Sequence, residues 1–160
     1  MMAAMGVAMS SGAVTTWSLG GTSVLPAAIL RDGSDIWIAD ESGAMWHVDP
    51  STGATTKYPA FIAPDGSFLA PDGICLAPDN YLYICTADGY VYRFDPVTYA
   101  FTEICYVAHY AFGIPQDICA GPPVGVPGAV YVGALTVPTS YPTVWTVASG
   151  QYVAQVPLIG

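Results

Sequence analysis

The side chains best suited to chemistry, imidazoles and thiols, are few and widely spaced in this chain. The sequence holds two histidines and four cysteines: His47, Cys75, Cys85, Cys105, His109 and Cys119. No two cysteines form a C-x-x-C pair, and neither histidine stands at zinc-finger spacing from them. Each cysteine lies within an apolar, strand-like run, so we expect all four to be buried as small hydrophobic residues.

Two of the cysteines leave a second interpretation open. Cys75 and Cys85 flank the turn-forming residues 78–80, and a hairpin closed there would bring their strands together. They could then face each other and form a disulfide. A register shift of one residue would turn them to opposite faces, so both states remain open.

The histidines offer little for nucleophilic catalysis. A Ser-His-Asp arrangement would have to use His47 or His109. His47 lies in an alternating strand, at the position that Arg93 takes in a second copy of the same pattern, which favours a solvent-facing side chain. His109 lies in a connection between groups of strands. Gly20-Gly21 follows a strand but opens no helix, so no phosphate-binding loop is predicted.

The charge balance excludes whole classes of partner. Twelve Asp and Glu stand against three cations, which gives a formal net charge of −9. Nucleic acids and anionic membranes are bound through clusters of Lys and Arg, and Arg31, Lys57 and Arg93 are too scattered to form one. We therefore predict no nucleic-acid partner and no membrane partner. A cation ligand remains compatible with this balance.

The surface is predicted to be poor in charge. Only 9% of the residues are charged and 53% are hydrophobic, whereas about 25% charged is ordinary for a soluble domain. The exterior must then consist largely of Tyr, Thr, Ser, Pro and Gly, and such a surface suits contact with other protein. We predict other protein chains as partners, in a homo-oligomer or a larger assembly. An unusually uncharged monomer is the alternative.

No targeting or membrane-spanning segment stands out in the sequence. No stretch approaches the roughly 20 consecutive apolar residues that cross a bilayer. Residues 1–13 are apolar but lack the basic start of a signal peptide and also fit a strand, so no signal peptide is predicted. The predicted location is extracellular or virion, with release in a particle on cell lysis as one route of export.

An internal repeat decides the fold. Residues 36–58 align without a gap on residues 82–104, an offset of 46. The matched pairs are Trp37 with Tyr83, Ile38 with Ile84, Gly43 with Gly89, Trp46 with Tyr92, Val48 with Phe94, and Asp49-Pro50 with Asp95-Pro96. Each copy predicts three strands, and one more short strand precedes each copy. Four antiparallel strands in about 45 residues are the size of one β-propeller blade.

The repeat extends over the rest of the chain in looser form. Equivalent turns are marked by glycine or a substitute at Gly12, Gly53, Tyr99 and Gly150. We predict one all-β, propeller-type domain over 1–160 with about three and a half four-stranded antiparallel blades. The half blade covers 1–20, and the full blades cover 24–60, 70–108 and 114–158.

The half blade leaves strand edges without a partner. Propellers usually have at least four blades, and open edges favour aggregation unless they are covered. Either the chain closes as an irregular four-bladed ring, or other chains cover its edges. The scarcity of charge favours the second, and therefore oligomerisation.

Residues 70–104 carry motifs that resemble known propeller families. These motifs are Pro71-Asp72-Gly73-Ile74-Cys75, Tyr81-Leu82-Tyr83 and Arg93-Phe94-Asp95-Pro96. The segment resembles a blade of the SMP-30/gluconolactonase family, and it is also similar to NHL-type blades and to those of streptogramin B lyases. The likeness to the lyases would imply a catalytic histidine, and neither His47 nor His109 has the flanking pattern of that family.

The resemblance to the gluconolactonase family implies a metal role for one residue. In that family an Asp just before Gly on the inner strand binds a central divalent metal, and this role falls on Asp72. Carboxylates converging there would bind a hard cation such as calcium through oxygen. The family's other ligands, a Glu and an Asn, are replaced by Pro26-Ala27 and Gln116-Asp117. The predicted metal ligands are therefore Asp72 and Asp117; the alternative is that Asp72 caps the start of its strand.

We predict a non-catalytic structural or binding module that is a subunit of a larger extracellular or viral assembly, with no cofactor apart from that cation. A reduced SMP-30-like metal-dependent lactonase or hydrolase is one alternative. A glycan-binding module is another, because aromatic residues recur at matching blade positions, although packing between blades explains the same recurrence. These aromatic residues are Trp17, Trp37, Trp46, Tyr83 and Trp145.

Overall fold

The protein folds into antiparallel β-sheets. The computed structural model describes residues 3–7, 14–19, 24–58, 70–106, 113–120, 130–136, 142–148 and 151–157, and every regular element in these ranges is a strand. The strands form three four-stranded sheets and one hairpin. This arrangement confirms the predicted all-β, propeller-type fold of about three and a half blades.

Each four-stranded sheet is a meander of consecutive strands, which we call a blade. Blade 1 contains β3 (Pro26–Asp32), β4 (Asp35–Asp40), β5 (Met45–Val48) and β6 (Thr55–Tyr58). Blade 2 contains β7 (Pro71–Leu76), β8 (Leu82–Thr86), β9 (Tyr90–Phe94) and β10 (Phe101–Tyr106). Blade 3 contains β11 (Gly113–Ala120), β12 (Val130–Thr136), β13 (Pro142–Ala148) and β14 (Gln151–Pro157). The hairpin pairs β1 (Ala3–Val7) with β2 (Val14–Ser18).

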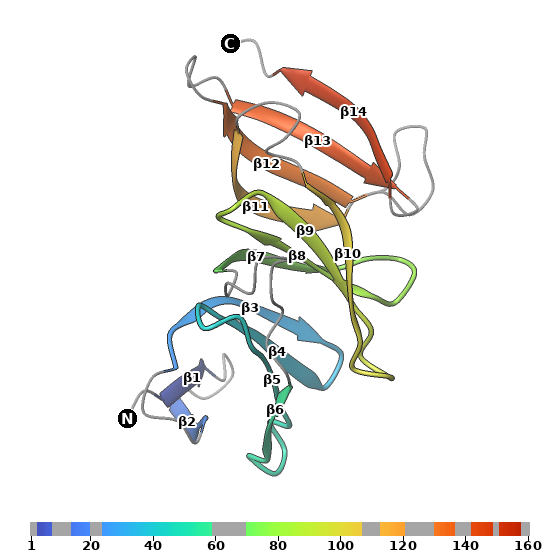
Figure 1. The fold of residues 1–160 in the computed structure, drawn as a ribbon. Coiled ribbons are helices and arrows are strands. Elements are labelled where there is room, and N and C mark those ends of the chain that lie inside the picture. Colours follow the sequence, from blue (N-terminus) through green and yellow to red (C-terminus); the bar gives the residue numbers. More distant parts are fainter. Residues whose placement is uncertain are drawn as a thin grey trace.

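The blades stack face to face in chain order (Figure 1). The first strands of the blades, β3, β7 and β11, lie next to one another with β7 in the middle, and we call them the inner strands. Since each blade runs from its inner strand outwards, the last strands β6, β10 and β14 are the outer strands. The hairpin of β1 and β2 lies beside blade 1, on the side away from blade 2.

Equivalent turns close the outer hairpins of blades 1 and 2. In each turn an Asp carboxylate, Asp49 or Asp95, accepts a hydrogen bond of 2.8 Å from the backbone N–H two residues on. The turn ends at Gly53 (φ 74°) in blade 1 and at Tyr99 (φ 61°) in blade 2. Tyr99 therefore adopts a left-handed conformation that usually belongs to glycine, at the position where the repeat predicted a glycine substitute.

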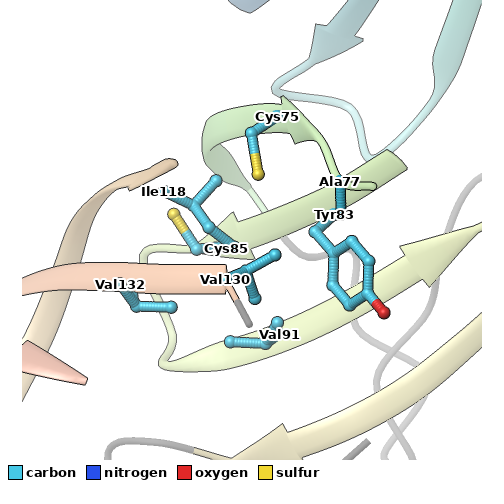
Figure 2. Close-up of a cluster of buried hydrophobic side chains, with 8 residues drawn as sticks. All are labelled: Cys75, Ala77, Tyr83, Cys85, Val91, Ile118, Val130 and Val132. Atoms are coloured by element: carbon cyan, nitrogen blue, oxygen red, sulfur yellow. The ribbon is translucent and has the colours of Figure 1, made fainter. Parts of the chain in front are cut away.

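Buried hydrophobic side chains form three clusters between successive layers. The hairpin and blade 1 share Leu19, Val24, Ile38, Trp46 and Val48. Blades 1 and 2 share Trp37, Ala39, Met45, Ile74, Leu82, Ile84, Tyr92 and Phe94. Blades 2 and 3 share Cys75, Ala77, Tyr83, Cys85, Val91, Ile118, Val130 and Val132, drawn in Figure 2.

The cysteines are more varied than the sequence predicted. All four are free thiols; Cys75 and Cys85 are buried, Cys105 is half-buried and Cys119 is exposed. The expectation that all four are buried is therefore wrong. Cys119 follows Ile118, which packs against blade 2, and alternation along the strand turns Cys119 to the other face of blade 3.

The alternative of a disulfide in blade 2 is also wrong. Across the β7–β8 ladder, Cys75 pairs with Tyr83 and Cys85 pairs with Gly73. The two cysteines are thus not opposite each other, and both sulfurs are free. The prediction failed because the turn residues alone do not determine the register of the two strands.

Candidate functional site at the inner strands

Each inner strand contains a β-bulge at the same place. The register shifts lie between Pro26 and Ala28 in β3, between Pro71 and Gly73 in β7, and between Pro115 and Asp117 in β11. The extra residues are Ala27, Asp72 and Gln116. A bulge leaves one residue outside the ladder and redirects its side chain, and bulges are common beside active sites. The recurring proline was the signal in the sequence that could have located all three bulges, because proline is compatible with a bulge.

The bulges determine which residues are equivalent to Asp72. They are Ala27 and Gln116, neither of which is an acid. Asp117, the predicted second ligand, is instead equivalent to Gly73. Its Oδ1 accepts a hydrogen bond of 2.8 Å from the backbone N–H of Ile118. A Cβ added to Gly73 would lie 2.9 Å from that same oxygen. Asp117 therefore lies against Gly73 of β7, the residue that directly follows Asp72.

Asp72 lies in a negatively charged environment formed by two turns. Burial raises the pKa of its carboxyl above the ordinary value, and the charges of Asp88 and Glu41 raise it further. Both turns are held to the inner strands by backbone hydrogen bonds of 2.9 Å, from Glu41 N to Leu25 O and from Ala87 N to Ala70 O. The fold thus holds two further carboxyl groups, those of Asp88 and Glu41, within electrostatic range of Asp72.

The arrangement supplies oxygen ligands but no complete cage. Within the part of the chain that the structure describes, no group of three or more His, Cys, Asp or Glu side chains is placed to hold a metal ion. No described residue donates a hydrogen bond to the Asp72 carboxylate. Calcium normally takes six to eight oxygen ligands, most of which would have to come from water or backbone carbonyls here. A metal role for Asp72 and Asp117 remains a prediction.

His47 is held in a structural contact. Its Nε2 lies 2.8 Å from Oδ1 of Asp35, and its ring packs on Trp37 with the centroids 4.7 Å apart. The side chain is 25% exposed, so the predicted solvent-facing position is only partly correct. On the neighbouring strand β6, the residue paired with His47 is Thr56. Among the described residues no serine hydroxyl bonds to His47, and His109 lies outside them.

The recurring aromatic residues are mostly core. Trp37, Trp46 and Tyr83 are all less than 10% exposed, and the indole N–H of Trp46 donates a 3.0 Å hydrogen bond to the buried Asp40. Trp17 is half-buried, and the side chain of Trp145 lies outside the described part. The rings of the buried residues cannot stack on a sugar from solvent, so the recurrence reflects packing between blades.

Comparison with known proteins yields likeness of fold but not of sequence. No protein-family model matches the chain, and no curated protein matches it. The described residues contain no helix that is long and apolar enough to cross a membrane.

Solved structures of propeller type are similar to the chain. The extracellular domain of BT4673 from B. thetaiotaomicron, assigned to a hybrid two-component system, matches with a TM-score of 0.68 and 14% identity over 98% of this chain and 19% of its own. A catalytically inactive virginiamycin B lyase from Staphylococcus aureus, solved with quinupristin, matches with a TM-score of 0.64 and 17% identity over 94% of this chain and 58% of its own. U3-55K matches with a TM-score of 0.60 and 16% identity over 86% of this chain and 41% of its own.

These likenesses establish the fold and no more. At 14–17% identity they do not carry activity or ligands from one protein to another. The chain spans less than two thirds of the length of each of these proteins. Blade shape is therefore the shared property, and the chemistry must be argued from this chain's own residues.

Proposed function

We propose that the chain is a non-catalytic structural or binding module that works through contacts with other protein chains, as a subunit of a larger extracellular or viral assembly. The observation that carries the proposal is the exposure of large apolar side chains on a charge-poor molecule. Ile29 is 61% exposed, Leu25 48% and Val97 81%, while 9% of the residues are charged. Exposed apolar side chains on so charge-poor a molecule favour contact with other protein.

Two further observations support the proposal. Of the three bulged residues at the candidate site, Asp72 carries a carboxyl group, whereas its equivalents Ala27 and Gln116 do not. One carboxylate is a poor basis for metal-dependent catalysis. The similar structures include the extracellular domain of an assigned sensor protein, which supports an extracellular location. Neither nucleic acid nor a membrane surface is a partner in this proposal, because the cations are few.

Static light scattering of the purified chain tests the proposal in its simplest form, a homo-oligomer. We expect a molar mass that is a multiple of 16.7 kDa at micromolar concentration. A stable monomer under these conditions would contradict self-assembly and restrict the proposal to partners of a different sequence.

A second candidate function is a reduced SMP-30-like metal-dependent hydrolase, which Asp72 favours because it is the bulged residue of β7 and the charges of Asp88 and Glu41 act on it. Calorimetric titration with calcium separates the two candidates. The hydrolase requires stoichiometric binding that the Asp72→Ala variant loses. The proposed module requires no cofactor, so a flat titration for both proteins agrees with it.

A further inference from the structure

Two tyrosine rings meet at the interface between blades 1 and 2. Tyr58 ends β6 of blade 1, and Tyr99 ends the turn between β9 and β10 of blade 2. Their ring centroids are 4.3 Å apart and their planes are inclined by 19°. The rings of Tyr90 and Tyr106, a pair within blade 2, are 4.5 Å apart and inclined by 38°. The pair between the blades is therefore the closer and the more nearly parallel of the two.

The hydroxyl groups of this pair also lie near each other. The pKa of Tyr58 is raised to about 12, first by burial and then by a hydrogen bond with the Tyr99 side chain and by its charge. The ring carbons next to each hydroxyl-bearing carbon, the ortho carbons, are thus brought toward the facing ring. Tyr58 is half-buried and Tyr99 is 45% exposed, so a reagent in solvent reaches the pair through Tyr99.

The backbone holds Tyr99 in a conformation that is costly for tyrosine. Its φ of 61° lies in the left-handed region, and the equivalent residue of blade 1 is Gly53, to which this region is freely open. The N–H of Tyr99 donates a hydrogen bond of 2.7 Å to the carbonyl of Asp95, which fixes the turn. Bulky residues with such a φ are rare, and they concentrate where strain serves a function. What tyrosine supplies here, and glycine does not, is the ring that packs on Tyr58.

Tyr58 is held from the side of blade 1 by its strand and by buried rings. It pairs with Met45 across the β5–β6 ladder. Its ring centroid lies 5.9 Å from that of Trp37 and 5.8 Å from that of Phe94, and both of these residues are buried. The fold therefore keeps the Tyr58 ring in contact with its partner.

We propose that Tyr58 and Tyr99 are a site of oxidative cross-linking, at which a haem peroxidase with hydrogen peroxide joins the two rings into dityrosine and links blade 1 covalently to blade 2. The inference goes beyond the proposed function, because the bond forms within one chain and requires no second subunit. It supplies the covalent link between blades that the cysteines do not, since all four are free thiols.

The reaction is a two-electron oxidation of the tyrosine pair. Each hydroxyl group loses one electron and one proton, which gives a tyrosyl radical whose unpaired electron is shared by the ortho carbons. One ortho carbon of each ring then forms a carbon–carbon bond with the other, and the hydrogen on each of these carbons moves to its oxygen as a proton. Hydrogen peroxide takes up the two electrons and the two protons and becomes two molecules of water. The linked chain therefore has two hydrogen atoms fewer than the parent.

The observed separation of the rings suits this product. In two directly bonded benzene rings the centroids are separated by two ring radii and one carbon–carbon bond, which is close to the 4.3 Å between Tyr58 and Tyr99. Rotation about the side-chain bonds then brings the ortho carbons together with little movement of the backbone. The bond closes a loop from β6 to the outer turn of blade 2. Such a closure lowers the conformational entropy of the unfolded chain, so it should stabilise the fold.

Oxidation of the full chain by peroxidase and hydrogen peroxide at neutral pH tests the proposal. Trypsin cuts after lysine and arginine, which places Tyr58 in peptide 58–93 and Tyr99 in peptide 94–160. We expect mass spectrometry to find these two peptides joined, with two hydrogens lost, in a chain that runs as a monomer on a denaturing gel. Fragmentation should locate the bond at the two tyrosines. The linked chain should also unfold at a higher denaturant concentration than the untreated chain.

Two phenylalanine variants separate this pair from the other tyrosine contact. Tyr90 and Tyr106 lie on the same two tryptic peptides, so Tyr106→Phe is the matched control and should still give the joined product. Tyr99→Phe keeps the ring that packs at the interface and lacks only the hydroxyl group, so it should fold and lose the product. Oxidation of the parent chain in denaturant should lose it as well, because unfolding separates the rings.

Several outcomes would overturn the proposal. A folded parent chain without the joined peptides would do so, and so would dityrosine found between chains only. Loss of the product in Tyr106→Phe but not in Tyr99→Phe would place the bond within blade 2. Equal yields from the folded and the unfolded chain would show that the fold does not bring the rings together, and an unchanged denaturation midpoint would contradict a link between the blades. None of these results bears on the light scattering that tests the proposed function.

Discussion

The interfaces on the two sides of blade 2 are built from different side chains. Toward blade 1, Trp37 and Phe94 meet edge to face with their centroids 5.4 Å apart, and Tyr58 stacks on Tyr99 at 4.3 Å. Toward blade 3, valine, alanine and cysteine dominate among the buried side chains that the structure describes; Tyr83 is the one buried ring among these, and half-buried Tyr81 packs against them. One blade thus carries an aromatic face and a small-residue face.

The difference shows two ways to bury the face of one blade against the next. Large rings fill the space between blades 1 and 2. Small side chains instead let the inner strands approach, and the space that a Cβ on Gly73 would need is taken by the backbone N of Ile118, 2.9 Å away. The equivalent of Gly73 in blade 1 is Ala28, which keeps its Cβ. The aromatic interface should therefore respond mainly to lost volume, and the small-residue interface mainly to added volume.

Truncation of a fully buried ring should have the largest effect. Phe94 and Val91 lie on the same strand and face opposite interfaces, and both are fully buried. Phe94→Ala should lower the free energy of unfolding by about 3–5 kcal/mol. Val91→Ala removes two carbon atoms and should lower it by roughly 1.5 kcal/mol. Chemical denaturation of both variants gives the values; equal losses would mean that the two interfaces do not differ as described.

Added volume should be harmful on the small-residue side. In Gly73→Ala the new Cβ would meet the backbone of Ile118 and Asp117, and we expect a loss of about 1–3 kcal/mol in unfolding free energy. Gly133→Ala is the control, because the nearest atom to its Cβ is Asp117 O at 3.9 Å, an ordinary contact. The control should stay within about 1 kcal/mol of the parent. A neutral Gly73→Ala would show that β7 and β11 are not in close contact.

Cysteine should contribute as a small hydrophobe at this interface. Cys85→Ala removes one buried heavy atom and should cost about 1 kcal/mol, whereas Cys119→Ala at the exposed position should change the unfolding free energy by less than about 0.5 kcal/mol. Burial raises the pKa of Cys85 and of Cys75 to about 12. A thiol reagent at neutral pH should therefore label Cys119 before either of them. Faster labelling of Cys85 would contradict the assignment.

The smallest expected effect is the pH dependence of Asp72. Its pKa is raised in the folded protein, so protonation stabilises the fold and that stabilisation is lost as the pH rises through the folded-state pKa. Asp72→Asn should therefore match the parent in acid and become more stable than it as the pH rises. Thermal unfolding of the two proteins across this range measures the difference. A gap that widens toward low pH would have the wrong sign.

The repeat in the sequence predicted the fold because turns and alternation are local properties. The offset between the copies located the strands of blades 1 and 2, and it placed Tyr99 at a glycine position, where φ is positive. Register and orientation depend on contacts between distant segments, and there the predictions were weaker. The turn after Cys75 did not show that Cys85 pairs with Gly73, and a strand-like run did not show that Cys119 faces away from blade 2.

The candidate site was partly accessible from sequence. Asp72 was identified from a motif, but its equivalence to Ala27 and Gln116, and the shift of Asp117 to the position of Gly73, follow from bulges that appear only when strands pair. The charges of Glu41 and Asp88 reach Asp72 because backbone hydrogen bonds hold their turns to the inner strands. No sequence pattern marks Ile29 as exposed, since its equivalents in blades 2 and 3 are buried.

Covalent footprinting with a carbene reagent, applied to the isolated chain and to the chain in the assembly that we propose for it, shows whether the exposed face of blade 1 is a protein contact. We expect Leu25 and Ile29 to be labelled in the isolated chain and protected in the assembly, while Ile74 and Ile118 are protected in both. Labelling of Ile29 that is unchanged on assembly, or labelling of Ile74 comparable to that of Ile29 in the isolated chain, would contradict it.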